Sequence, residues 1–231
     1  MDVLVEGVRH AVGLLLGGDP EILTVLWLSL QVSGTATLIA LLLGIPAGAT
    51  LALTRFPGRT FLVSAVNTGM GLPPVVVGLF VTILLWRSGP LGDWEVLYTP
   101  AAIVLAQAVI ASPLVTGITL AAVQNVPAKF RLQLLALGAS RVQMVWVTLR
   151  EARLPMLAAI MAGFGGVISE IGASMMVGGN IKGQTRTLTT AMVLETGKGE
   201  FGVAIALSIL LMLLVFGVNW ALTTVQQRRA F

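Results

Sequence analysis

Long apolar stretches separated by short polar ones dominate this sequence. Five of them reach the roughly 20 residues that an α-helix needs to cross a hydrocarbon core of about 30 Å. They lie at residues 24–54, 61–86, 100–123, 154–177 and 201–225. We therefore expect an all-α membrane protein with five core transmembrane helices. The first stretch is longer than a span requires, which predicts a tilt or a kink at Pro46.

Two other segments depart from this pattern, at 1–20 and 124–153. Residues 1–20 combine apolar positions near helical spacing with Asp2, Glu6 and Arg9, which is typical of a helix lying in the membrane interface. No linker rich in Pro, Gly or Ser divides the rest of the chain. We therefore expect an interfacial segment over 1–20 and a single membrane domain over 21–226.

The segment 124–153 is too long for a simple connection between packed spans, and its sequence is strongly helical. Pro127 suits a helix start. The helix that follows has one apolar face, made by Phe130, Leu134 and Leu137. Gly138 interrupts this helix, and Ala139 begins a second helical stretch. The pattern predicts two helices joined at a glycine corner, with an apolar face that projects from the membrane.

Composition narrows the class of protein. Charged residues make up 10% of the chain and the mean hydropathy is +0.95, whereas a soluble domain has about 25% charged residues. Cys is absent and His10 is the only histidine, so we expect no disulfide framework and no metal site. The net charge of +4 does not indicate nucleic acid, because the cations lie in loops between apolar runs. The composition therefore predicts a protein embedded in the lipid bilayer, with lipid as its surroundings.

Lys and Arg are distributed unevenly between these loops. If the N-terminus lies outside, nine of the 14 Lys and Arg residues fall in inside segments and five in outside segments. Cytoplasmic loops of membrane proteins carry an excess of Lys and Arg. The count therefore predicts an outside N-terminus and a cytoplasmic C-terminus.

The glycine corner carries a family resemblance. The run LLALGASR at 134–141, followed by Leu154 and Pro155, resembles the cytoplasmic loop of permease subunits of type I ABC importers. In that family the loop forms a coupling helix that docks on the ATPase. The resemblance implies coupling residues at Phe130, Leu134, Leu137, Gly138, Ala139, Ser140 and Arg141. The alternative is an amphipathic helix that lies on the inner leaflet.

Two further runs resemble the permeases for oxyanions. They are LPPVVVG at 72–78 and SEIGASMMVGGNI at 169–181, which continues into the outer loop as KGQTRTLTTAM. The run LREAR at 149–153 is most similar to tungstate permeases, as is the distance from Gly138 to Leu154, which is four residues longer than usual in this family. Molybdate and sulfate permeases are the alternatives within the family. The resemblance implies an importer in a bacterial or archaeal cytoplasmic membrane.

The same resemblance implies the partners of this chain. They are a second copy of the chain, a dimer of ATP-binding subunits that holds ATP and magnesium, and an extracytoplasmic oxyanion-binding protein. The outer loop residues expected to receive that binding protein are Asn180, Lys182 and Arg186. The sequence has no G-x-x-x-x-G-K-[ST] motif, so we expect no ATP hydrolysis by the chain itself.

Residues inside two spans are typical of a transport pathway. Pro73 and Pro74 lack backbone donors, so the second span must break or kink beside Asn67, where a cavity or only a packing kink would receive the freed carbonyls. The fourth span is rich in small residues that line a narrow path or pack against neighbouring helices. The candidate pathway or gate residues are Asn67, Pro73, Pro74, Ser169, Glu170, Gly172 and Ser174.

Glu170 is the one ionisable residue well inside a predicted span. A lone carboxylate would repel an anionic cargo, so we interpret it as a structural or gating partner of Lys182, of Arg186 or of a backbone donor. The alternative is a glutamate that reaches the outer headgroups. An ion-coupled secondary transporter or channel would need more such residues, and a membrane scaffold is the remaining class.

Overall fold

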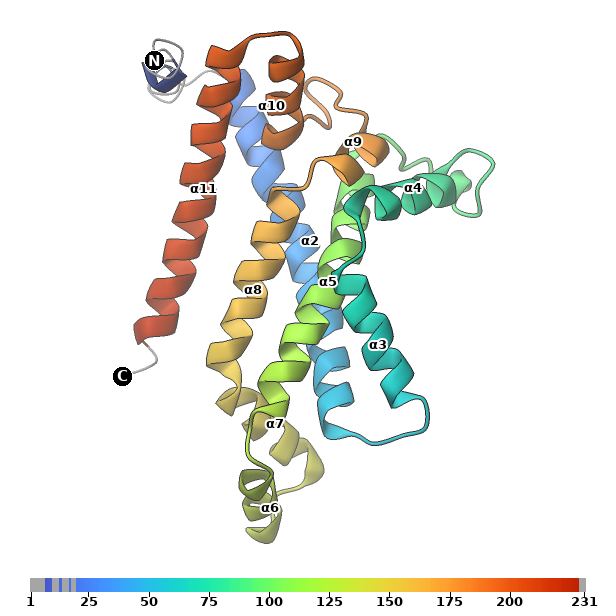
Figure 1. Cartoon of the computed structure of the whole chain (residues 1–231), viewed down its shortest axis with the longest axis vertical. Helices are drawn as coiled ribbons and strands as arrows, with labels where there is room; N and C mark the ends of the chain where they lie inside the picture. Colours follow the sequence, from blue (N-terminus) through green and yellow to red (C-terminus); the bar gives the residue numbers. More distant parts are fainter. Residues whose placement is uncertain (1–6, 10–12, 14–16, 18–19, 229–231) are drawn as a thin grey trace.

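The computed structural model of the chain describes residues 7–9, 13, 17 and 20–228, and the described residues form helices joined by short loops (Figure 1). The all-α prediction is therefore confirmed. The predicted interfacial helix over 1–20 falls mostly outside the described residues, so it stays a prediction. The same holds for the domain boundary that it implies.

Three helices in the described part of the chain are long and apolar enough to cross a membrane. They are α2 (Pro20–Leu53), α5 (Pro100–Gln124) and α11 (Phe201–Arg228). The number rises to five if two bent pairs each count as one span, α3 (Arg59–Met70) with α4 (Pro74–Leu85) and α7 (Arg141–Glu151) with α8 (Arg153–Ile168). The α2 helix continues through Pro46, so the proline does not end it.

Small residues hold α2, α5 and α8 together. A Cβ added at Gly48 of α2 would lie 2.5 Å from the carbonyl oxygen of Thr116 in α5, so only glycine permits this approach. Next to this crossing, a buried apolar cluster joins the three helices through Ala40, Ala111, Val115, Ala159 and Val167. These helices form the rigid part of the fold, against which the other elements are positioned.

The second span is broken, as predicted. Helices α3 and α4 meet at 103°, and α4 lies across the long axis of the molecule (Figure 1). Backbone hydrogen bonds from Gly71 and Leu72 close the last turn of α3, and the fixed φ of Pro73 then starts α4 in a new direction. Helix α4 packs on α5 and on α9 (Gly172–Gly178).

The fourth span differs from its prediction. A continuous helix over 154–177 was expected, but α8 ends at Ile168 and α9 begins at Gly172. Helix α8 has 16 residues and is about 24 Å long, shorter than the hydrocarbon core. Ser169 explains part of the ending, because its hydroxyl donates to the carbonyls of Gly165 and Gly166 and competes with the helical bonds.

The end of the molecule opposite α6 (Ala128–Ala136) contains a helix that the sequence pattern did not predict. Helix α10 (Leu188–Gly197) lies in the segment expected to be an outer loop, and it packs against α11 and α2 (Figure 1). Thr187 starts it through a capping box with Thr190. The first turn is buried, so residues 188–191 belong to the core.

Candidate functional site

The corner around Gly138 is formed by α6 (Ala128–Ala136), Gly138 and α7. Gly138 has φ +85°, and the backbone N–H groups of Ala139 and Gly138 donate to the carbonyls of Leu134 and Leu135, both at 3.0 Å. This pair of bonds is the Schellman ending of a helix, which needs a left-handed residue. A Cβ at Gly138 would meet no atom within 4 Å, so the backbone conformation and not the space requires glycine.

Ser140 begins the second helix of this corner. Its hydroxyl accepts from the backbone N–H of Gln143 at 3.3 Å, and the Gln143 side chain accepts from the Ser140 N–H at 2.8 Å. This capping box moves the helix start to Arg141, two residues after the predicted start at Ala139. Ser140 and Arg141 are exposed, and Ala139 is half-buried.

The predicted apolar face of the corner is divided in the structure. Phe130 and Leu134 are both half-buried, and Phe130 packs against a buried cluster at the ends of α5 and α8 nearest the corner. Leu137 is 85% exposed and Leu132, which was not a candidate, is 65% exposed. Trp146 and Val142 on α7 are also exposed. Large exposed apolar side chains therefore gather on this projection beyond the ends of the spans.

At the other end of the molecule, the break between α8 and α9 is a polar junction. Glu170 Oε1 accepts from the backbone N–H of Ala173 at 2.9 Å, so this carboxylate caps the first turn of α9. Thr189 Oγ1, in the first turn of α10, donates to the Glu170 carbonyl at 3.3 Å. The junction is therefore tied to the next helix along the chain.

Gln107 of α5 completes this junction and was not among the sequence candidates. The side chain is only 2% exposed; its Nε2 donates to the Val167 carbonyl at 3.0 Å and to Ser174 Oγ at 3.3 Å. One amide thus bridges the end of α8 and the start of α9. Its Oε1 has no hydrogen-bond partner among the described residues. A glutamine inside an apolar span was the signal that could have identified it.

The cations of the outer loop do not meet Glu170. Lys182 Nζ lies 2.7 Å from a carboxylate oxygen of Glu21 at the start of α2, and Arg186 Nη1 lies 3.9 Å from the other one. Of the three partners considered for Glu170, the structure shows the backbone donor, which is the N–H of Ala173. The two cations instead join the loop after α9 to the outer end of α2.

The remaining candidates are placed differently from one another. A Cβ at Gly172 would lie 2.6 Å from Val75 Cγ2, so the segment begun by Pro73 and Pro74 packs directly on the α8–α9 junction. Asn180 has φ 52°, and its Nδ2 donates to the Thr190 carbonyl at 3.4 Å. Asn67 lies on the exposed surface of α3, and no residue of that helix is buried.

Neither region has the composition of a metal centre. Across the part of the chain that the structure describes, His, Cys, Asp and Glu side chains do not gather in the groups of three or more that could hold a metal ion. The polar junction contains one carboxylate, hydroxyls and one amide, which suits helix capping and hydrogen bonding.

Comparison with known proteins agrees with this architecture. Residues 40–231 match the family described as binding-protein-dependent transport system inner membrane component. The chain belongs to this family. It is therefore a multi-pass membrane permease subunit, and the hydrolysis of ATP belongs to a separate subunit of such transporters.

Individual relatives are similar over most of their length. The chain is 37% identical to the tungstate uptake system permease protein TupB of Peptoclostridium acidaminophilum, over 98% of this chain and 100% of the relative. It is 42% identical to a probable anion ABC transporter permease protein of Haloferax volcanii, over 83% and 84% of the two chains. It is 34% identical to the molybdenum transport system permease protein ModB of Escherichia coli, over 80% and 85%.

The fold is also that of a solved permease. The MetNI methionine ABC transporter, in an inward-facing conformation, superposes with a TM-score of 0.73 at 20% identity, over 91% of this chain and 98% of that chain. The type I ABC permease fold is thereby confirmed. At this identity the likeness concerns the fold alone.

Proposed function

We propose that this chain is the permease subunit of an ATP-dependent importer that moves a tetrahedral oxyanion, tungstate, into the cell. The observation that carries the proposal is the 37% identity, over 98% of the chain, to a tungstate uptake permease. Molybdate is the second candidate, since a molybdenum permease is 34% identical over a smaller share of the chain. Both cargoes are tetrahedral dianions of similar size.

The transporter requires partners for this activity. A second copy of the chain would complete the path, a dimer of ATP-binding subunits would bind ATP and magnesium, and an extracytoplasmic protein would deliver the oxyanion. The family description supports the delivery protein, because it names a binding-protein-dependent system. The chain then supplies alternating access, whose two states are biased by ATP on one side and by the loaded binding protein on the other.

The proposed orientation places the N-terminus outside and the C-terminus in the cytoplasm. The distribution of Lys and Arg supports it, and α6 with α7 then projects into the cytoplasm. Cysteines introduced at Gly92 and Gly183 should react with an impermeant reagent from outside, whereas a reporter fused after Phe231 should be cytoplasmic. Labelling of Gly183 only from the cytoplasm would contradict the orientation.

The corner around Gly138 is the proposed docking element for the ATPase. The exposed leucines Leu132 and Leu137 would be buried in the complex, and the stiff glycine corner would transmit the movement of the ATPase to α8. Phe130 would act inside the chain, because it ties α6 to the ends of α5 and α8. The docking surface therefore includes Leu132 and excludes Phe130.

The α8–α9 junction is the proposed gate. Two of its polar bonds come from side chains of α5 and α10 and not from the helix ladder, so these two can exchange when the helices move. Glu170 would then hold the closed gate by capping α9. An ion-coupled secondary transporter is a weaker alternative, since this carboxylate already serves a backbone donor.

The proposal is tested by reconstituting the chain with its ATPase and its binding protein in vesicles. Tungstate-loaded binding protein should stimulate ATP hydrolysis and uptake of tungstate, and molybdate should compete less well. Uptake that needs no ATPase subunit, or that follows an ion gradient, would contradict the importer and favour a secondary transporter. Equal use of sulfate, molybdate and tungstate would contradict the choice of cargo only.

A further inference from the structure

The loop between α4 and α5 encloses a pocket that the proposed gate does not use. The pocket has a volume of about 560 Å³ and is lined by Leu85, Trp86, Arg87, Gly92, Glu95, Leu97 and Tyr98. It lies beside the outer end of α9, because the backbone N–H of Tyr98 donates to the Val177 carbonyl at 2.8 Å. A ligand in this pocket would therefore contact a loop that is bonded to the end of α9, the helix that begins at the proposed gate.

Two residues of this loop have an unusual backbone. Glu95 and Tyr98 both lie in the left-handed region, at φ 52° and φ 64°. Such a conformation is unfavourable for a non-glycine residue and persists only where its surroundings impose it. Gly179 makes room for Tyr98, since a Cβ there would lie 2.9 Å from the tyrosine ring. The loop is thus held in a defined, strained shape.

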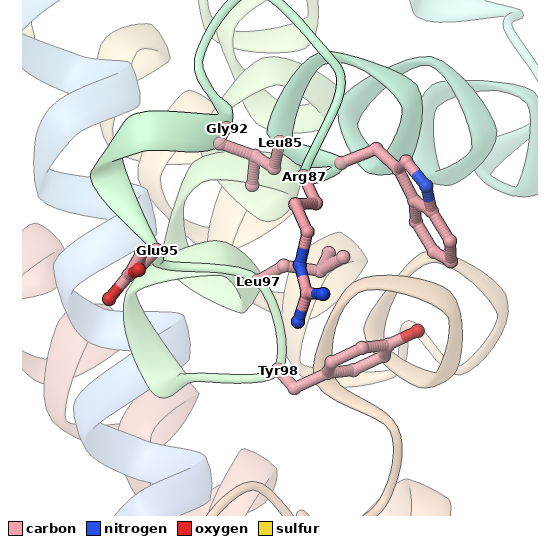
Figure 2. Close-up of a pocket in the computed structure, with 7 residues that line it drawn as sticks. Leu85, Arg87, Gly92, Glu95, Leu97 and Tyr98 are labelled. Carbon is pink, nitrogen blue, oxygen red and sulfur yellow. The ribbon is translucent and has the colours of Figure 1, made fainter.

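The strained shape keeps two opposite charges apart. In Figure 2 the guanidinium of Arg87 extends toward the ring of Tyr98, and the carboxylate of Glu95 points away on the other side of the loop. Neither side chain forms an ion pair or a side-chain hydrogen bond with any residue that the structure describes. By contrast, Lys182 and Arg186, the cations expected to receive a partner, are already placed against Glu21.

We propose that this pocket is the seat for a polar segment of the extracytoplasmic binding protein, with an acidic side chain against Arg87 and a basic one against Glu95. The inference rests on the proposed function, because that function requires such a partner. The docking charges of the outer face are then in the loop between α4 and α5, and Lys182 and Arg186 serve to hold the outer end of α2.

The size and the charges of the pocket favour a protein segment over smaller ligands. A single tetrahedral oxyanion would fill only a small part of 560 Å³ and would be held by one cation, Arg87, because the Glu95 carboxylate points away from it. A lipid phosphate would use Arg87 but would leave Glu95 without a partner. A folded protein surface carries both signs of charge and can satisfy both residues.

The test uses the reconstituted transporter and titrates tungstate-loaded binding protein while ATP hydrolysis is measured. Arg87→Glu and Glu95→Arg should each raise the half-saturating concentration by about tenfold at low salt, with less effect at high salt. The rate at saturation and the basal rate should change less than twofold. The matched control is the exchange of Glu195 and Lys198, an outer pair bonded to each other at 2.7 Å, which should leave the titration unchanged.

The double variant Arg87→Glu with Glu95→Arg distinguishes docking from an internal pair. It should be at least as impaired as either single variant, because both partner contacts are reversed. Recovery in the double variant, or unchanged half-saturation in the single ones, would overturn the proposal. Charge reversals on the binding protein that recover the single variants would support it.

Two further measurements address other occupants. Equilibrium dialysis of free tungstate without the binding protein should show no binding that depends on Arg87. Binding of tungstate that is lost in Arg87→Glu would make the pocket an oxyanion site and overturn the proposal. An effect of Arg87→Glu on the basal rate in anionic but not in neutral lipid would make it a lipid site. If the parent protein is not stimulated by the loaded binding protein at all, the proposed function fails instead.

Discussion

Two helix interruptions in this molecule, at Gly138 and at Glu170, are built in opposite ways. The corner at Gly138 is made by neighbours in sequence: a left-handed glycine, two backbone bonds within six residues and a capping box four residues long. The junction at Glu170 has local bonds from Ser169 and Glu170, but it is completed by Gln107, which is 60 residues away from its partner Val167, and by Thr189, which is 19 residues away from Glu170. A local interruption stays rigid when helices move, and a non-local one depends on where the helices are.

The difference suits two roles within a transporter. A coupling element must transmit movement without changing its own shape, which a locally determined corner can do. A gate must have two arrangements, which is possible when its bonds are shared between helices that shift relative to each other. The four predictions below challenge this contrast, from the largest expected effect to the smallest.

The largest effect is expected from Leu137→Asp in the local corner. The side chain is exposed in the isolated chain, so folding should be unaffected, but docking would bury an unpaired charge. Such burial costs about 3–5 kcal/mol, which corresponds to a loss of affinity for the ATPase of roughly a hundredfold or more. This affinity is measured by binding the ATPase subunit to the permease in nanodiscs.

Gln133→Asp is the matched control for this variant, because Gln133 is already polar and exposed on the same helix. Its affinity for the ATPase should stay near that of the parent. Parent-like binding by Leu137→Asp would remove the corner from the docking surface and end the comparison.

The second prediction concerns the conformation at Gly138. Gly138→Val should destabilise the corner by about 1–2 kcal/mol, because the left-handed conformation is unfavourable for a residue with a Cβ. Gly138→Asn should recover most of the transport, since asparagine tolerates this region. Uptake per ATP hydrolysed is the measurement, and Gly34→Ala, at an open helical position, is the control. Equal transport by the valine and asparagine variants would mean that the corner is not rigid.

The third prediction concerns the non-local junction. Gln107→Leu removes both bonds that the amide donates and should destabilise the protein by about 1–2 kcal/mol in detergent. Ser174→Ala should cost less in the Gln107→Leu background than in the parent, the non-additivity expected of residues in contact. Gln124→Leu, exposed on the same helix, should change little. Full additivity of Gln107 and Ser174 would show that the junction does not act as a unit.

The smallest change in stability is expected from Glu170→Gln. The amide oxygen can still accept from the Ala173 N–H, so unfolding should shift by less than about 1 kcal/mol. If the carboxylate holds the gate, ATP hydrolysis without loaded binding protein should rise. The effect should add fully to that of Lys182→Gln, because Lys182 pairs with Glu21. If the effects of Glu170→Gln and Lys182→Gln do not add, Glu170 interacts with the outer loop. If Glu170→Gln hydrolyses ATP only with loaded binding protein, as the parent does, Glu170 has no gating role.

Much of the fold and of the corner at Gly138 follows from the sequence alone. The apolar stretches predicted the spans because the hydrocarbon thickness sets a length that short-range composition must meet. Pro73 and Pro74 predicted the broken second span, because a missing N–H and a fixed φ act at the residue itself. Gly138 and Ser140 likewise form the corner because each acts on the backbone at or next to its own position.

What only the tertiary structure decided concerns residues whose partners are distant. The sequence left Glu170 three possible partners, Lys182, Arg186 or a backbone donor, and the structure has the backbone donor. The two cations lie against Glu21, because α2 packs beside the loop. The end of α8 at Ile168, the buried start of α10 and the bridging role of Gln107 likewise depend on helices that meet in space. Local rules determine where a helix can stop, and the packing of other helices determines which freed backbone group finds a partner.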